Sequence, residues 1–180
     1  MTENGSLLIE GMKSYPKALA AITEFVSSVI STIREVLTED ENGLSNAVDV
    51  KITDEGLIDY LRPSRLSGSG SEDKLMGVRF DKRPEMGWSL YFYLWWSPAA
   101  EFGISLYFND AQLAALAFNS LAKASGGKCR TQGSRELYFS RPLAMNDSGE
   151  FREIVRESVQ DFSAVLSRAG GLKKLTKQTL

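Results

Sequence analysis

The stretch from Trp88 to Phe108 most constrains the fold, because it holds two runs of alternating apolar residues joined by a short link. The first run ends at Trp96, the link covers 97–101, and the second run begins at Phe102. Side chains of a strand point alternately to the two faces of its sheet. The stretch therefore predicts an antiparallel hairpin. Because an isolated hairpin is only marginally stable, we expect these strands at the centre of a larger sheet.

The two faces of this predicted hairpin differ in chemistry. One face is purely apolar, so we expect helices to cover it; it carries Trp88, Leu90, Phe92, Leu94, Trp96, Phe102, Ile104, Leu106 and Phe108. The other face combines aromatic rings with hydroxyls and carries Ser89, Tyr91, Tyr93, Trp95, Gly103, Ser105 and Tyr107. Such a face suits either a half-exposed binding surface or a second core beneath a helix. The sequence leaves both alternatives open.

Three segments show the three- and four-residue apolar spacing of amphipathic helices, over 14–43, 109–127 and 147–171. Ser14 and Pro16 mark the expected start of the first, and glycine pairs mark the ends of the other two. The first helix has few charges even on its polar face. We interpret its apolar stripe as core, although a partner could cover part of it. Separately, the sequence leaves a homodimer open.

Shorter alternating runs predict further strands over 48–52, 58–60, 76–80 and 136–141. The first two would form a hairpin around Asp54-Glu55-Gly56, with a short helix over 54–62 as the alternative. Since strands that follow one another usually pair, the fold class is α+β. We expect a single domain, 1–180, in which three helices pack on an antiparallel meander of five to six strands.

Two segments are expected to lie outside this packed structure. The serine- and glycine-rich stretch 64–74 has the composition of a flexible surface loop. The tail, 172–180, follows the helix-ending glycines and is expected to fray.

The composition excludes several kinds of site. The chain has 180 residues and no histidine, which removes Ser-His and Cys-His nucleophiles and histidine-based zinc sites. Its one cysteine, Cys129, forms no internal disulfide and fits a reducing compartment. The sequence has no long uncharged apolar run, and its polar, acidic first residues lead us to expect no signal peptide. We therefore expect a cytoplasmic protein with no catalytic residue, metal, cofactor or membrane partner.

Charge is unevenly distributed, although the net charge is only −2. Acid concentrates between residues 35 and 59, where Lys51 is the only base from Glu35 onward. This acid predicts a basic protein partner, because opposite charges speed association. The candidate contact residues are Glu39, Asp40, Glu41, Asp54, Glu55 and Asp59, with Tyr91, Tyr93, Trp95 and Tyr107 as aromatic anchors. A pI near 5.3 argues against nucleic acid as the partner.

Element order from Met76 to Arg141, together with the first helix, resembles the core of the restriction-endonuclease-like nucleases. That resemblance implies an acidic residue and a carboxylate-x-lysine motif on the core strands, yet 102–108 carries neither carboxylate nor lysine. Asp49-Val-Lys51 and Glu72-Asp-Lys74 match the triplet, but off that strand. Size and class also resemble small acidic secretion chaperones and toxin-immunity proteins. We therefore expect a non-enzymatic protein-binding domain of bacterial type, with a carboxylate-dependent enzyme or degenerate nuclease as the alternative.

Overall fold

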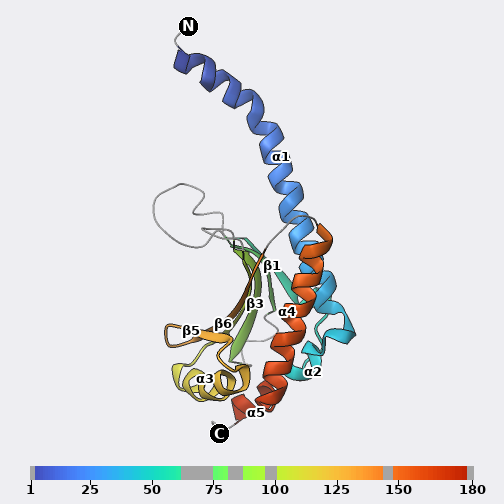
Figure 1. Cartoon of the computed structure of the whole chain (residues 1–180), viewed down its shortest axis with the longest axis vertical. Coiled ribbons are helices and arrows are strands. Elements are labelled where there is room, and N and C mark those ends of the chain that lie inside the picture. Colours follow the sequence, from blue (N-terminus) through green and yellow to red (C-terminus); the bar gives the residue numbers. More distant parts are fainter. Residues whose placement is uncertain (1–2, 62–74, 81–86, 96–100, 144–147, 178–180) are drawn as a thin grey trace.

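The computed structural model describes residues 3–61, 75–80, 87–95, 101–143 and 148–177. The predicted α+β class is confirmed, with a six-stranded antiparallel sheet and helices around it (Figure 1). The helices are α1 (Glu3–Thr38), α2 (Leu44–Val48), α3 (Ala111–Ser125), α4 (Ser148–Arg168) and α5 (Leu172–Lys177). The strands are β1 (Leu57–Leu61), β2 (Leu75–Phe80), β3 (Trp88–Trp95), β4 (Glu101–Phe108), β5 (Cys129–Gln132) and β6 (Glu136–Pro142).

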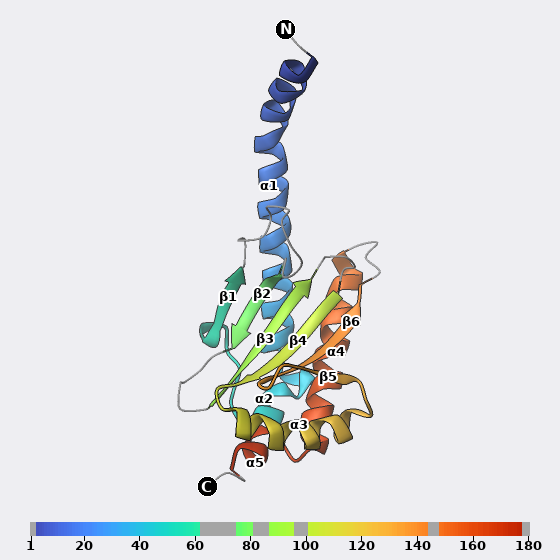
Figure 2. The ribbon, with the colours of Figure 1, turned by 90° about the vertical axis from the view of Figure 1, so that its left-hand side faces the viewer.

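The sheet has the strand order β1-β2-β3-β4-β6-β5, and every neighbouring pair is antiparallel. The predicted hairpin of β3 and β4 lies at its centre. Figure 2 shows the strands in front of α1 and α4, with α3 and α5 at one end of the sheet. Helices therefore cover one face of the sheet, and α3 and α5 close one end of the core.

The core lies where the apolar sheet face meets these helices, as predicted. Phe92, Phe102, Ile104 and Leu106 are each 0% exposed. The ring of Phe102 meets Phe151 of α4 edge to face, with centroids 6.3 Å apart. Trp96 lies outside the described residues.

The predicted strand over 48–52 is wrong, and so is the hairpin built on it. The chain forms the short helix α2 up to Val48, and Asp49 then adopts a left-handed conformation with φ 56°. Val48 and Ile52 are buried in the core, so their alternation reflects packing against the body rather than a strand. β1 pairs with β2 instead. A 3₁₀ turn over Asp54–Gly56 replaces both the predicted turn and the longer helix alternative.

The predicted frayed tail is also wrong over the residues that the structure describes there. Gly170 and Gly171, with φ of 96° and 80°, turn the chain back after α4. The next helix, α5, then packs against the core and buries Leu172 and Leu175. The predicted loop over 64–74 lies outside the described residues, which resume at β2.

Two further elements differ from expectation. α1 begins at Glu3, so Ser14 is not its N-cap and Pro16 stands inside the helix. β5, which pairs with β6, is a further strand that the sequence did not predict. Asp110 caps α3, because its side chain accepts hydrogen bonds from the backbone N–H groups of Gln112 and Leu113 at 2.7 and 2.9 Å.

Candidate protein-binding surface

The sheet face that points away from α1 and α4 carries all four predicted aromatic anchors. We call it the aromatic face. Tyr91, Tyr93, Trp95 and Tyr107 are all half-buried, in contrast to the fully buried rings on the other side of the same strands. No helix among the described elements covers this face, which is turned toward the viewer in Figure 2. Within the described residues, the alternative of a second core beneath a helix is therefore not realised.

Strand register aligns one row of side chains across the sheet. Arg79 pairs with Tyr91, Tyr91 with Ser105, Ser105 with Tyr138, and Tyr138 with Arg130. A small serine that is 1% exposed thus lies at the centre of the row, with a tyrosine and then an arginine on each side of it. Large amphipathic side chains on a rigid sheet are well suited to recognising a protein surface. Alternation along 76–80 and 136–141 turns Arg79 and Tyr138 to this face, but the sequence did not place them or Arg130 among the contact residues, because the alignment of their strands requires the register.

A second row shows how one ring is held against the sheet. Tyr93 pairs with Gly77 on one side and Gly103 on the other. A Cβ atom on Gly103 would lie 2.6 Å from the Tyr93 ring, so the ring lies across the glycine. A side chain at that position would displace the ring. Gly103 therefore positions Tyr93 within the aromatic face.

Charges on the aromatic face balance. Arg79 and Arg130 lie there by register, and so do Glu101 and Glu136. Ser105 donates a hydrogen bond to the Glu136 carboxylate, so one of these acids is engaged within the sheet. The charges that the described strands place on this face therefore sum to zero and supply no net positive field of the kind that phosphate backbones require.

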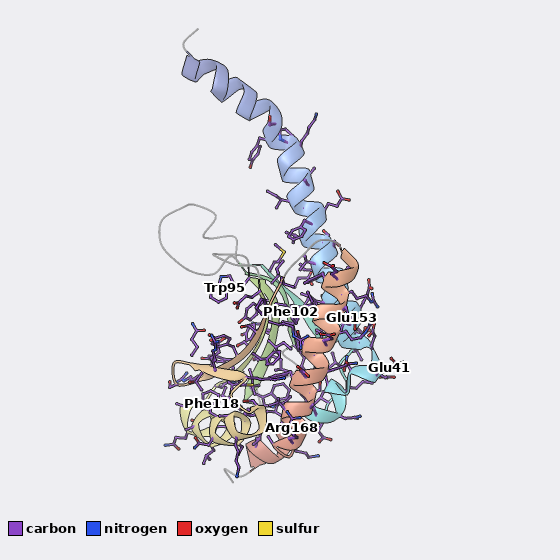
Figure 3. The ribbon with its side chains drawn as sticks, viewed as in Figure 1. Glu41, Trp95, Phe102, Phe118, Glu153 and Arg168 are labelled. Atoms are coloured by element: carbon purple, nitrogen blue, oxygen red, sulfur yellow. The ribbon has the colours of Figure 1, made fainter. Side chains whose placement is uncertain are left out.

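The predicted acidic residues lie elsewhere. Figure 3 shows Glu41 and Trp95 on opposite sides of the molecule, so a single contact does not combine them. The structure thus separates the two halves of the predicted interface. Asp40, Glu41 and Glu55 are exposed and make no ion pair with the described residues.

Two of the predicted acidic residues, Asp54 and Asp59, pair with one arginine inside the fold. Arg34 of α1 donates to Asp54 at 2.5 Å, to Asp59 at 2.6 Å and to the carbonyl of Leu57 at 2.8 Å. Burial alone would lower the pKa of Arg34, but its hydrogen bonds to Asp59 and Asp54 outweigh this and raise it. This arginine ties α1 to the start of β1. The carboxylates of Asp54 and Asp59 therefore help to hold the fold together. This differs from the expectation that few bases compensate the acidic residues.

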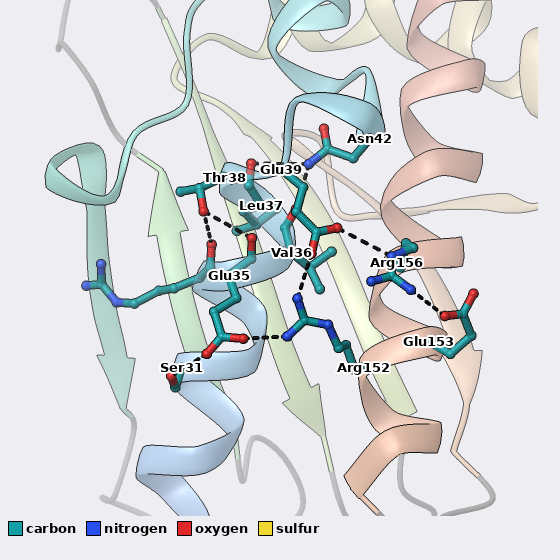
Figure 4. A network of polar contacts seen from close by, with 11 residues as sticks. Ser31, Glu35, Val36, Leu37, Thr38, Glu39, Asn42, Arg152, Glu153 and Arg156 are labelled. Carbon is teal, nitrogen blue, oxygen red and sulfur yellow. Dashed lines mark hydrogen bonds and ion pairs between the residues drawn. The ribbon is translucent and has the colours of Figure 1, made fainter.

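A second cluster of ion pairs joins α1 to α4 (Figure 4). Arg152 bonds to Glu35 and, at 2.7 Å, to Glu39. Arg156 reaches Glu39 at 3.4 Å and Glu153 at 2.6 Å. Glu39 is thus held between two arginines, which no local sequence pattern could indicate because the partners are more than a hundred residues apart.

We expect this cluster to make stability depend on pH. The hydrogen bonds from Arg152 and Ser31 lower the pKa of Glu35 below its ordinary value of 4.5. A carboxylate with a lowered folded-state pKa stabilises the fold above the unfolded-state pKa and loses that effect as pH falls through the folded-state pKa. Glu35→Gln should therefore cost up to about 1 kcal/mol at pH 7, since the pair is exposed.

The measurement is urea unfolding of wild type and Glu35→Gln between pH 7 and 3. The difference between their free energies of unfolding should become smaller below about pH 4.5. Glu24→Gln removes the same charge from an exposed part of α1 and should give no such difference. A wild-type advantage that stays constant down to pH 3 would contradict the assignment.

Other candidate chemistry receives little support from the residues that the structure describes. Burial raises the pKa of the Cys129 thiol, which accords with an unreactive cysteine despite its basic neighbours. No three carboxylate or thiol side chains in the described ranges converge to hold a metal. None of the described helices is both long and apolar enough to cross a membrane.

The positions of the carboxylate-x-lysine triplets and the number of strands weaken the resemblance to the nucleases. Asp49 caps α2 and Lys51 follows in an exposed stretch outside the sheet, while 72–74 lies outside the described residues. β4 gains a carboxylate at its first residue, Glu101, but two strands follow α3 where the resemblance implies one. Comparison with protein-family models, with curated proteins and with solved structures finds no match to this chain.

Proposed function

We propose that this protein is a non-catalytic binding domain that receives a polypeptide partner on its aromatic face. The observation that carries the proposal is the row from Arg79 through Tyr91, Ser105 and Tyr138 to Arg130, on a face without a described helix over it. Tyrosine and arginine are the side chains that most often dominate protein interfaces. Their rigid placement on a sheet limits the entropy lost on binding.

A bacterial immunity protein or secretion chaperone is the kind of protein that would work in this way, by binding alone. The proposal differs from the sequence expectation in where the partner docks. The aromatic rings supply the anchors, and the balanced charge of their face favours a partner of mixed charge rather than a strongly basic one. The carboxylates of Asp40 and Glu41, on the opposite side, would act on the partner only through long-range attraction that changes the association rate.

The test is capture of a partner from an extract of the source cells by immobilised wild-type chain, followed by titration of the purified partner. Tyr91→Ala combined with Tyr107→Ala should weaken binding by about 30-fold or more, as expected for the loss of interface anchors. Near-ultraviolet circular dichroism checks that the variant retains its folded core.

Asp40→Asn combined with Glu41→Gln is the matched control, because it alters the opposite side of the molecule. It should retain the wild-type affinity. Loss of binding in this variant, with full binding by the tyrosine variant, would overturn the proposal in favour of the acidic surface. Binding that ribonuclease or deoxyribonuclease abolishes would identify nucleic acid as the ligand and overturn the polypeptide assignment.

A further inference from the structure

The N-terminal part of α1 projects away from the rest of the molecule (Figures 1 and 2). We call residues 3–28 the projecting segment. Its described side chains are exposed except Val26, which is half-buried, and burial begins at Val29. Large apolar side chains are among those exposed: Tyr15 at 66%, Ile22 at 52% and Phe25 at 40%. These are unusual on the outside of a helix unless another surface covers them.

The exposed residues continue the stripe that the body buries. Tyr15, Ile22, Val29 and Val36 recur every seven residues. Val26 and Ile33 repeat at the second position of the same heptad, with Leu19 at that position by sequence. This alternating spacing of three and four is the pattern of a coiled-coil seam. One half of the seam packs on the sheet and α4, and the other half has no described partner.

Charge narrows what can cover the free half. Between residues 14 and 28 the only charged side chains are Lys17 and Glu24. They are seven residues apart, so they share one side of the helix, and the heptad places that side opposite the seam. The positions that flank the seam include Thr23 and Phe25 and carry no charge. Two copies of this helix would therefore meet without electrostatic repulsion.

Two other occupants fit less well. A helix that binds an anionic membrane surface has a polar face rich in lysine and arginine, whereas Lys17 is the only base here between residues 14 and 28. A helix that selects a different coiled-coil partner usually does so through charges flanking the seam, which are absent from this sequence. The seam's own chemistry thus favours self-association.

We propose that the protein forms a two-fold homodimer in which the projecting segments of two copies pack antiparallel along this seam. The position of the body determines the relative orientation of the two helices. Val29 and Ile33 continue the seam and face the body, so the body lies on the seam side of the helix. In a parallel pair, both bodies would occupy the space between the two helices. In an antiparallel pair, each segment lies along the other and the bodies lie at opposite ends.

The first test is the mass of the full chain in solution, by sedimentation or light scattering across a concentration series. Ile22→Glu places a charge in the seam and should weaken association by more than about tenfold. Ala20→Glu places the same side chain in the same turn, on the exposed opposite face, and should remain dimeric. A monomeric wild type, or equal dimerisation of both variants, would overturn the proposal.

The second test fixes the orientation by spin-label distances in a Cys129→Ser background. A label at Ser28, near the end of the segment, should be roughly 35–40 Å from its counterpart in an antiparallel pair, at 1.5 Å per residue. A label at Lys17, near the centre, should give roughly 20 Å. Similar short distances at both sites would show a parallel pair. Either outcome leaves the aromatic face, which is a separate surface, to its own experiment.

Discussion

Replacing Phe92 by alanine is expected to lower the free energy of unfolding by about 3–5 kcal/mol. Phe92 is 0% exposed at the centre of the sheet, where it lies beside Val78 of β2 and Ile104 of β4. Its removal would leave a cavity between the sheet and the helices, because close-packed neighbours relax only in part. Chemical denaturation at neutral pH measures the change.

Tyr91→Ala is the informative comparison, because Tyr91 is adjacent in sequence but points to the aromatic face. Its loss should cost clearly less than that of Phe92, since its ring is half-buried and no described helix packs on it. Equal costs for the two substitutions would mean that both faces are core. A Phe92→Ala protein as stable as wild type would mean that the sheet faces are assigned the wrong way round.

The central strands were predictable because local pattern and burial agree there. Every second residue from Trp88 to Leu94 is apolar and buried, so alternation alone identifies both strand and inner face. The segment around Val48 and Ile52 has the same alternation but packs as a short helix and a loop. Alternation in so short a run reports only that some side chains are buried, and the left-handed Asp49 that ends α2 carries no distinctive sequence signal.

The candidate surface was predictable in part, for a similar reason. Tyr91, Tyr93, Trp95 and Tyr107 follow from alternation along two strands. The rest of the surface depends on which strand lies beside which, a long-range property that brings Tyr138 and Arg130 into line only through β6 and β5. The same limit applies to the acidic residues. Their density was visible, but the distant arginines that pair with Glu39 were not.

Gly77→Ala should be among the most destabilising single-methyl changes in this chain. A Cβ atom there would lie 1.9 Å from the carbonyl oxygen of Phe92 and 2.7 Å from the Cα of Tyr93. Both atoms belong to the backbone of β3, so the methyl group could be accommodated only if two central strands moved apart. Glycine inside a strand often marks such a close approach. The expected loss is on the order of 3 kcal/mol, the upper end for overpacking.

Gly103→Ala separates this backbone conflict from crowding of a side chain. The three atoms nearest to its Cβ would all belong to the Tyr93 side chain, the closest at 2.6 Å, and that ring can rotate away toward solvent. We expect a loss of about 1 kcal/mol, together with a change in the fluorescence or near-ultraviolet signal of the aromatic face. Unfolding midpoints of the two variants, measured under the same conditions, show which substitution costs more stability. If Gly77→Ala proves no more costly than Gly103→Ala, then β2 and β3 do not approach as closely at this point as the structure has them.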